Sequence, residues 1–152
     1  MAVRNLTDGA AFKQLIVPQS IAGDGAAHEG ASRIKGGDGE TVTFLVEVGA
    51  MDAASTLDFK VIQADAATAG NTKDVTSAAL TQVAAASGAS KVYAVEVRCD
   101  AALDSANGYK WLGISYTVTN AKNVLLSVLA VNFLMRRLPA TNGLTQAVKV
   151  LV

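Results

Sequence analysis

The sequence predicts an all-β protein, either an antiparallel β-sandwich or a jelly-roll-like barrel, with at most one short helix and extended terminal arms. Two observations support this class, and the length of the chain indicates the number of domains. Apolar and polar side chains alternate over several short β-branched runs, which is the two-residue period of a half-buried strand. Thirteen glycines against two prolines indicate many tight turns. A length of 152 residues suits one domain.

The N-terminal part of the chain predicts one short strand and one long loop. An apolar stretch over residues 12–17 stops at Pro18, as a strand edge or turn would. Residues 19–39 are polar and rich in glycine, which indicates a long surface loop with one short strand around residues 32–35. Loops of this length in a compact domain usually serve a function or are mobile.

Two strands with strict alternation follow. Val42, Phe44 and Val46 begin the first run, which ends at residue 48, and residues 57–62 alternate again after a turn. Each run predicts a strand with one buried face. Because only a short turn separates them, we expect the two strands to pair antiparallel.

Residues 74–87 carry mixed signals. Their many alanines favour a helix, whereas Thr76, Thr81 and Val83 favour a strand. We predict one short helix or helical turn in this segment.

The second half of the chain predicts three strands. Residues 91–98 alternate, residues 101–108 form a turn, and residues 111–119 alternate again. A tight hairpin connection then leads into the apolar strand 124–135. Both faces of that strand are apolar, so we expect it to lie centrally in a sheet or to pack against a neighbouring subunit.

The two ends of the chain differ from the middle. Residues 1–11 read as an N-terminal arm, residues 12–139 as the sandwich domain, and residues 140–152 as a C-terminal tail. The tail finishes with apolar residues, which do not remain in water without cover. We expect the tail to dock, either on its own domain or on a neighbouring subunit.

Composition argues against several classes of partner. Thirteen basic residues balance thirteen acidic ones, whereas nucleic-acid binding requires a basic surplus on one face. The apolar run 124–135 is too short to cross a bilayer as a helix. Residues 1–11 lack the basic-then-apolar order of a signal peptide, which predicts synthesis in the cytoplasm. We therefore expect neither a nucleic-acid nor a membrane partner.

Residues that could carry chemistry are few. His28 and Cys99 are the only histidine and the only cysteine, so a structural zinc site lacks ligands. We interpret His28 as a solvated loop residue and Cys99 as a small packed side chain that forms no internal disulfide. No set of residues matches a nucleophile, base and orienting group. The sequence predicts a structural or binding protein that is not an enzyme and needs no cofactor.

Two weaker candidate sites contain charged residues. Asp100, Asp104 and Asn107 could place oxygen ligands around a calcium ion, although the ordered ligand pattern of a calcium loop is incomplete. Arg136 and Arg137 follow the apolar strand and could contact an acidic partner. Solvated side chains are the simpler interpretation of both groups.

The segment Thr56–Asp65, followed by Thr72–Thr76, resembles small β-sandwich proteins encoded among the head genes of tailed bacteriophages. In those proteins a strand ending in Gln-x-Asp or Gln-x-Ser leads through a turn to Asp-Val. A last strand then ends near basic residues and a proline, as residues 132–139 do here. The likeness extends over about two thirds of the chain, in strand rhythm and a few residues.

This resemblance implies a capsid decoration, or cement, protein. Such a protein is a structural component of the virion that binds the outer surface of a phage capsid and stabilises it by bridging major capsid protein subunits. It often assembles as a homotrimer or homodimer. The candidate assembly contacts in this chain are two arginines and four residues of the apolar tail: Arg136, Arg137, Val148, Val150, Leu151 and Val152.

Two other functions fit the same residues. A phage neck or tail subunit would also be an all-β, oligomeric structural protein. A carbohydrate-binding module would use Tyr109, Trp111 or Tyr116 as a stacking platform, but the chain has few aromatic residues and its strands need them for the core.

Overall fold

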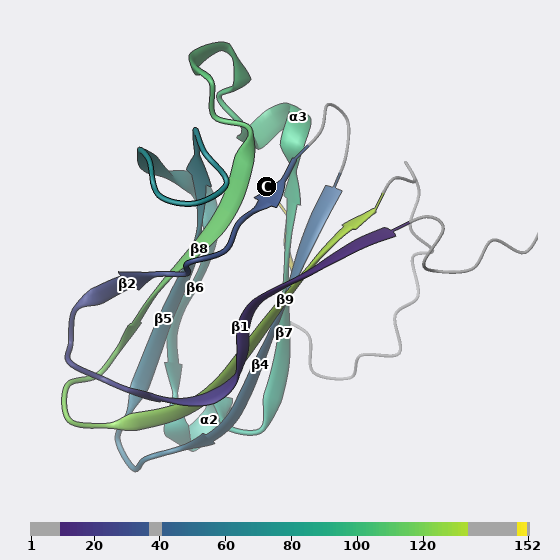
Figure 1. Cartoon of the computed structure of the whole chain (residues 1–152). Coiled ribbons are helices and arrows are strands. Elements are labelled where there is room, and N and C mark those ends of the chain that lie inside the picture. The colour runs from purple at the N-terminus through teal and green to yellow at the C-terminus, as the bar shows by residue number, and fades with distance from the viewer. Residues whose placement is uncertain (1–9, 37–40, 134–148, 152) are drawn as a thin grey trace, which may run out of the picture.

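Two mostly antiparallel sheets pack face to face, which confirms the predicted all-β sandwich (Figure 1). The computed structural model describes residues 10–36, 41–133 and 149–151. In chain order its elements are β1 (Ala10–Ala22), β2 (Ala27–Glu29), β3 (Ile34–Lys35), β4 (Thr41–Met51), β5 (Thr56–Ala64), β6 (Thr72–Ala84), α2 (Ala85–Gly88), β7 (Lys91–Arg98), α3 (Cys99–Ala102), η1 (Ser105–Asn107), β8 (Trp111–Val118), β9 (Asn123–Phe133) and β10 (Lys149–Leu151).

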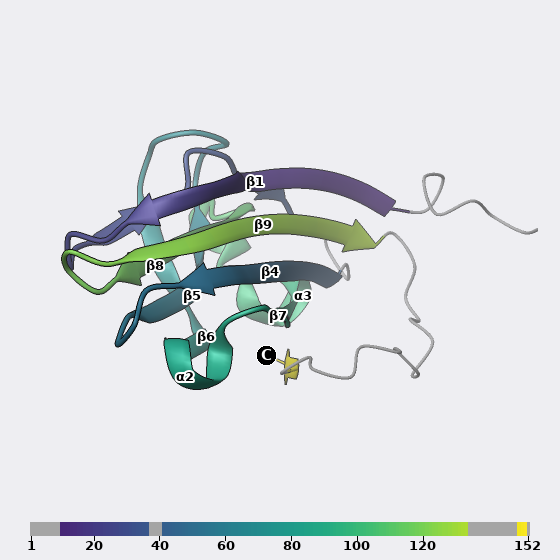
Figure 2. The same cartoon turned by 90° about the horizontal axis from the view of Figure 1, so that it is seen from below.

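The strand order is that of a jelly roll. Sheet A has the order β1-β9-β4-β7-β10, and sheet B has the order β2-β8-β5-β6, with β3 also paired to β8. If β2 and β3 count as one interrupted strand and β10 is set aside, eight strands form two Greek keys. Figure 2 shows β1, β9 and β4 side by side in sheet A. Neither sheet closes on itself, so the molecule is a sandwich and not a barrel.

The core lies between the sheets and comes from the alternating runs. In β4 and β5 each predicted inward residue is at most 2% exposed: Val42, Phe44, Val46, Val48, Leu57, Phe59 and Val61. Leu112 and Ile114 of β8 and Val95 and Val97 of β7 complete the same layer. Burial of each such side chain contributes about 1.5–3 kcal/mol, so this layer is the main source of stability.

Two predicted hairpins are wrong. β4 pairs with β7 and β9 in sheet A, whereas β5 pairs with β6 and β8 in sheet B. The connection from β8 to β9 crosses between the sheets in the same way. Alternation fixes which face of a strand is buried, but it does not fix the partner, because a strand that crosses to the opposite sheet buries the same face. The prediction that the apolar strand lies centrally is confirmed, since β9 lies between β1 and β4.

The first strand continues through Pro18, where the sequence predicts a stop. β1 pairs with β9 as far as Ala22, and its register shifts between Ile16 and Gln19. Pro18 lies within that irregularity on an edge strand, where a missing N–H breaks no ladder bond. The predicted loop therefore begins later, and it includes β2 as well as β3, which confirms the short strand expected around residues 32–35.

The mixed segment is mainly a strand and not a helix. β6 extends to Ala84, and only the four residues of α2 are helical. Ser77 and Gln82 have φ angles of 64° and 45° and lie where the pairing with β5 changes register. These bulges interrupt the two-residue alternation, which hides the strand in the sequence. A second short helix, α3, and the 3-10 turn η1 occupy the predicted turn at 101–108, so the structure has one more short helix than expected.

Candidate functional site

The outward side of sheet A is a mostly apolar surface made by alternate residues of four strands. In β9, even-numbered residues such as Leu126 and Val128 enter the core, so odd-numbered residues point outward. Register with β9 identifies the outward residues of β1 and β4, and register with β4 identifies those of β7. We call this surface the sheet A outer face. Four of its residues are buried, namely Thr43, Ala94, Ser127 and Val131, and the others are Phe12, Gln14, Leu45, Glu47, Val92, Glu96, Leu125 and Leu129.

Large apolar side chains are exposed on and beside this face. Phe12 and Leu125, at opposite ends of it, are each 45% exposed, and Val17, in the irregular part of β1, is 60% exposed. Among the residues that the structure describes, these three are the exposed large hydrophobic ones. Their position on one sheet and its edge strand is typical of a surface that another polypeptide covers.

A glutamine fixes the irregular part of β1. The Gln14 Nε2 amide donates to the Ile16 carbonyl oxygen at 2.6 Å and to Ser127 Oγ and the Val128 carbonyl oxygen at 3.3 Å. These bonds hold the bulge against β9 and leave Val17 outside the sheet. Beside the bulge, an open depression of about 250 Å³ is lined by Pro18, Gln19, Glu47, Gly49, Leu125, Leu126 and Ser127.

The outward side of sheet B differs from that of sheet A, because the Arg33 side chain covers part of it and an ion pair lies on it. Buried Arg33 lies over Gly113, where a Cβ would come within 3.0 Å of the Arg33 Cγ. Its guanidinium donates to the carbonyl oxygens of Ala66 and Ala69, which holds the β5–β6 loop in place. On β5 and β6 of the same sheet, Lys60 Nζ and Asp74 Oδ1 form an ion pair at 2.8 Å.

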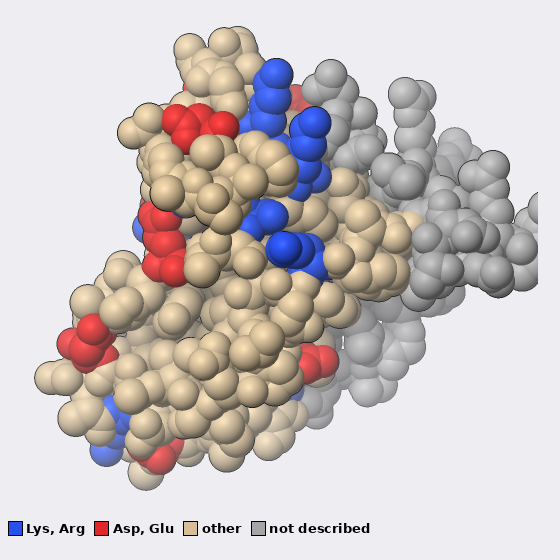
Figure 3. Space-filling view, in the orientation of Figure 1, with Lys and Arg blue, Asp and Glu red and all other residues tan. Residues whose placement is uncertain are grey.

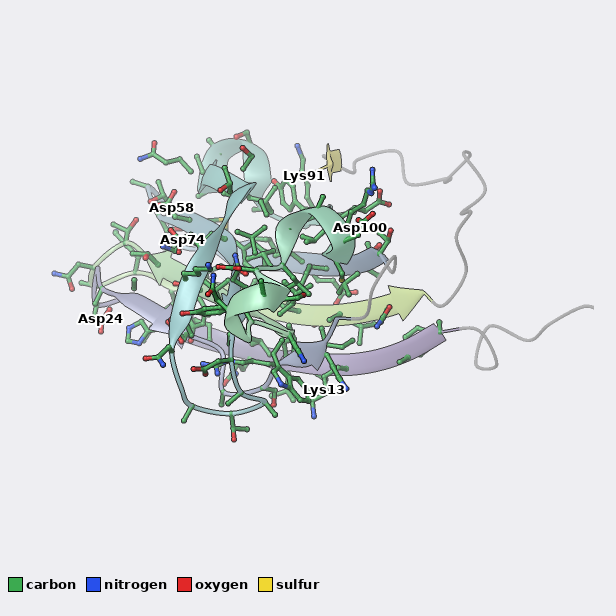
Figure 4. All side chains as sticks on the ribbon, turned by 90° about the horizontal axis from the view of Figure 1, so that it is seen from above. Lys13, Asp24, Asp58, Asp74, Lys91 and Asp100 are labelled. Atoms are coloured by element: carbon green, nitrogen blue, oxygen red, sulfur yellow. The ribbon has the colours of Figure 1, made fainter. Side chains whose placement is uncertain are left out.

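Charges are distributed unevenly over the surface. Figure 3 shows a group of Lys and Arg side chains above a broad area without charged atoms on the visible face. Figure 4 labels six charged residues, which extend outward from different elements, with Asp24 at the left of the view and Asp100 beside α3. The six labelled side chains do not converge on one centre.

The predicted C-terminal docking residues are only partly within the described structure. β10 pairs in parallel with β7, with Val150 opposite Val95 and Leu151 opposite Glu96. Residues 149–151 therefore lie on the domain of their own chain in this structure. Four of the six candidate assembly contacts fall outside the described residues: Arg136, Arg137, Val148 and Val152.

The two candidate calcium-binding carboxylates, Asp100 and Asp104, each form an ion pair with a basic side chain. Arg98 Nη2 lies 2.7 Å from Asp100 Oδ2 and lowers the pKa of that carboxyl group. Lys73 and then Asn107 donate to Asp104, and these bonds lower its pKa. Over the described ranges, no group of three or more His, Cys, Asp or Glu side chains is placed to hold a metal ion.

His28 lies on β2 at the open edge of sheet B, where the sequence predicts a loop residue. Its Nε2 atom is 2.9 Å from both carboxyl oxygens of Asp24, and its ring stacks on Tyr116 with centroids 5.8 Å apart. The hydrogen bond from His28, followed by that from the Ala26 backbone N–H, lowers the pKa of Asp24. The pair links the β1–β2 turn to β8 through Tyr116.

The three aromatic residues proposed for carbohydrate stacking do not form one platform. His28 stacks on the Tyr116 ring, and Lys73 Nζ lies 4.4 Å from the centroid of the Tyr109 ring. Trp111 opens β8 and pairs with Ala64 and Lys35 in sheet B. Each tyrosine ring therefore has one face occupied by a side chain of the same protein.

Phe12, Val17 and Leu125 were not among the candidate contacts predicted from the sequence, although a signal for one of them was present. Leu125 belongs to the strand with two apolar faces, and one of those faces must point away from the core. The exposure of Phe12 and Val17 could be predicted only from the pairing of β1 with β9. These two strands lie far apart in the sequence.

Over the described residues, no helix has the length and apolar character needed to cross a membrane. The chain has no match to a known family model, to a curated protein or to a solved structure.

Proposed function

We propose that this chain is a structural virion protein that binds the outer surface of a phage capsid and bridges subunits of the major capsid protein. The proposal assigns it no reaction and no cofactor. Its site of action would be the capsid surface, after synthesis in the host cytoplasm. The observation that carries the proposal is the sheet A outer face, with Phe12, Val17 and Leu125 exposed.

The contrast between the two sheets supports an assembly role. Sheet B is covered in part by Arg33 and carries the Lys60–Asp74 ion pair, so its outward side suits water. Sheet A presents apolar side chains that gain stability when another protein covers them. A protein that binds an assembled lattice better than its free subunits stabilises that lattice by mass action. An interface of about 800 Å² per partner would suffice.

The fold class agrees with this role by analogy alone. Jelly rolls occur in viral capsid proteins and in lectins, and a fold does not determine a function. The partly covered tyrosine rings make a lectin-like platform the weaker of these two analogies.

The direct test combines the purified chain with undecorated capsids of the phage that encodes it. We expect binding at a fixed stoichiometry and a higher melting temperature of the shell. Absence of binding at saturating protein would remove the proposal. Rings or tubes formed by the chain alone would favour a neck or tail subunit, and selective signals on a glycan array would favour a carbohydrate-binding module.

A triple variant assigns the contact surface. Phe12→Ser, Val17→Ser and Leu125→Ser together should weaken capsid binding at least tenfold, because each loses part of the 1–2 kcal/mol or so that burial of its exposed apolar surface contributes. Circular dichroism should show that the variant remains folded. The matched control, Lys60→Ser with Asp74→Ser on sheet B, should bind like the unmodified chain. The reverse pattern would move the contact to sheet B.

A further inference from the structure

We propose that the depression beside the β1 bulge accepts a lysine or arginine side chain of the protein that covers the sheet A outer face. The methylene stem of that side chain would lie against Pro18 and Leu125, and its cationic end would meet the Glu47 carboxylate. This inference deepens the proposed function, on which it rests for the covering protein, and it adds the chemistry of one contact.

The depression exists because short residues stand among longer ones on adjacent strands. Gly49 of β4 has no side chain, and a Cβ built on it would lie 2.9 Å from the Leu125 Cβ. Ser127 of β9 lies opposite Glu47 in the register, and its Oγ accepts a hydrogen bond from the Gln14 amide at 3.3 Å. A longer residue at position 49 would therefore displace Leu125 or occupy the space beside it.

The walls of the depression are apolar. Leu125 is 45% exposed, and Pro18 is exposed on the irregular part of β1. Exposed apolar atoms gain stability when aliphatic groups cover them. Lysine and arginine side chains bury their methylene stems on such a surface while the charged end stays at its rim. The walls therefore suit the stem of a long basic side chain.

Glu47 gives the depression its charge. It is the one charged residue of the lining, and it is exposed. Its register partners on β9 and β7, Ser127 and Val92, are uncharged. Within the described ranges no lysine, arginine or histidine forms an ion pair with Glu47, whereas Lys60 and Lys73 each have an acidic partner. The Glu47 carboxylate is therefore open to a cation from another protein.

Coverage of the sheet A outer face would take the Glu47 carboxylate out of water. A carboxylate buried without a partner costs free energy, and an acidic side chain placed opposite would add repulsion. The outer face includes no lysine or arginine that could neutralise Glu47. The covering protein must therefore supply the cation, and arginine is one of the residues enriched at protein interfaces.

The size of the depression favours one side chain over a small-molecule ligand. Its volume is about 250 Å³, and it is open to solvent. Small-molecule sites usually measure about 300–1,000 Å³ and bury most of their ligand. An open hollow of this size holds one side chain and leaves the rest of the contact to the face around it.

Titration with blocked amino acids tests the depression without a capsid. The probes are N-acetyl-arginine N-methylamide and its lysine analogue, each added to the isotope-labelled full-length chain and followed by the NMR shifts of backbone amides. We expect saturable shifts at Gly49 and Ser127, with a Kd on the order of millimolar for probes of this size. The citrulline analogue keeps the shape of arginine without its charge, and it should bind at least about threefold more weakly than the arginine probe.

Glu47→Gln removes the charge and keeps the size of the side chain. It should weaken binding of the charged probes about threefold and leave citrulline binding unchanged. Asp74→Asn is the matched control, because it removes one carboxylate from an exposed position on sheet B. That variant should bind every probe like the unmodified chain. Equal binding of charged and neutral probes, shifts confined to other residues, or no saturable shift would each overturn the inference.

Capsid binding distinguishes failure of this inference from failure of the proposed function. Glu47→Lys should weaken binding to undecorated capsids at least about tenfold, because it places like charges in contact, whereas Asp74→Lys should bind like the unmodified chain. Unchanged capsid binding by Glu47→Lys would overturn the inference and keep the proposed function. If no form of the chain binds capsids but the charged probes bind at Glu47, the proposed function is removed and the depression keeps its assigned ligand.

Discussion

Asp104 shows how a single partly exposed carboxyl group organises the segment after β7. Lys73 and Asn107 both donate to its side chain, and the Asp104 backbone N–H donates to Gln63 Oε1 at 2.8 Å. The Lys73 bond is the largest cause of its lowered pKa, and the ordinary value is 3.8. Because the folded pKa lies below the unfolded one, the stabilising contribution is present above about pH 4 and is lost as pH falls through the folded pKa.

Replacement of Lys73 by Met should therefore raise the pKa of Asp104 toward its ordinary value. A carbon-detected NMR titration of the Asp104 carboxyl group measures this shift. Asn107→Ala should produce a smaller rise, since Asn107 is the second cause. An unchanged titration in the Lys73 variant would show that the ion pair does not form in solution.

Adjacent residues of β5 provide a second test at the residue scale. Phe59 is 1% exposed in the core, whereas the Lys60 side chain points outward. Phe59→Ala should lower the free energy of unfolding by about 3–5 kcal/mol, because it leaves a cavity. Lys60→Ala should change it by less than about 0.5 kcal/mol. Urea denaturation of both variants measures the difference, and equal losses would contradict the assigned faces.

At the scale of elements, Gly23 positions the crossing of the chain from sheet A to sheet B. Its N–H donates to the Lys122 carbonyl oxygen at 2.7 Å, and its carbonyl oxygen accepts from the Ala121 N–H at 2.9 Å. A Cβ at this position would lie 2.1 Å from the Thr119 carbonyl oxygen. Any side chain therefore forces the β1–β2 turn away from the β8–β9 turn.

Gly23→Ala should accordingly destabilise the protein by about 2–3 kcal/mol. Gly108→Ala is the matched control, because Gly108 has a φ of 89° but nothing within 4 Å of a built Cβ. That variant should lose only about 1 kcal/mol through backbone strain. Thermal denaturation compares the two, and a larger loss at Gly108 would contradict the close approach at Gly23.

Sequence reasoning located strands better than it located their partners. The runs in β4, β5, β7 and β8 were predictable because each alternates without interruption over a buried face. The course of β1 through Pro18 and that of β6 past Ser77 were not, because bulges break the alternation. Partners depend on which sheet each strand joins, and local pattern carries no such information.

The candidate site was predictable only in outline. The predicted strand with two apolar faces indicated a surface that another polypeptide could cover. That strand is β9. The identity of Phe12 and Val17 as exposed residues depends on the pairing of β1 with β9 and on the Gln14 amide that fixes the bulge. Neither feature follows from the neighbouring sequence.

At the scale of the whole molecule, the tail can be separated from the sandwich by truncation. Removal of residues 143–152 should leave a folded chain with a β-type circular dichroism spectrum, because β10 adds only three paired residues to sheet A. The same truncation should shift the chain from a small oligomer to a monomer in light scattering. Insoluble protein would instead show that the tail is required as the last strand of its own domain.

The order of strands in sheet A also constrains how the protein is made. β1 pairs with β9 along nearly its whole length, from Ala10 opposite Phe133 to Ala22 opposite Asn123. During translation β1 therefore remains unpaired until the ribosome has added more than a hundred further residues. Topologies that depend on such distant pairings fold slowly and expose unpaired edges meanwhile. A nascent chain that stalls before residue 123 would leave β1 without its partner strand and available to aggregate.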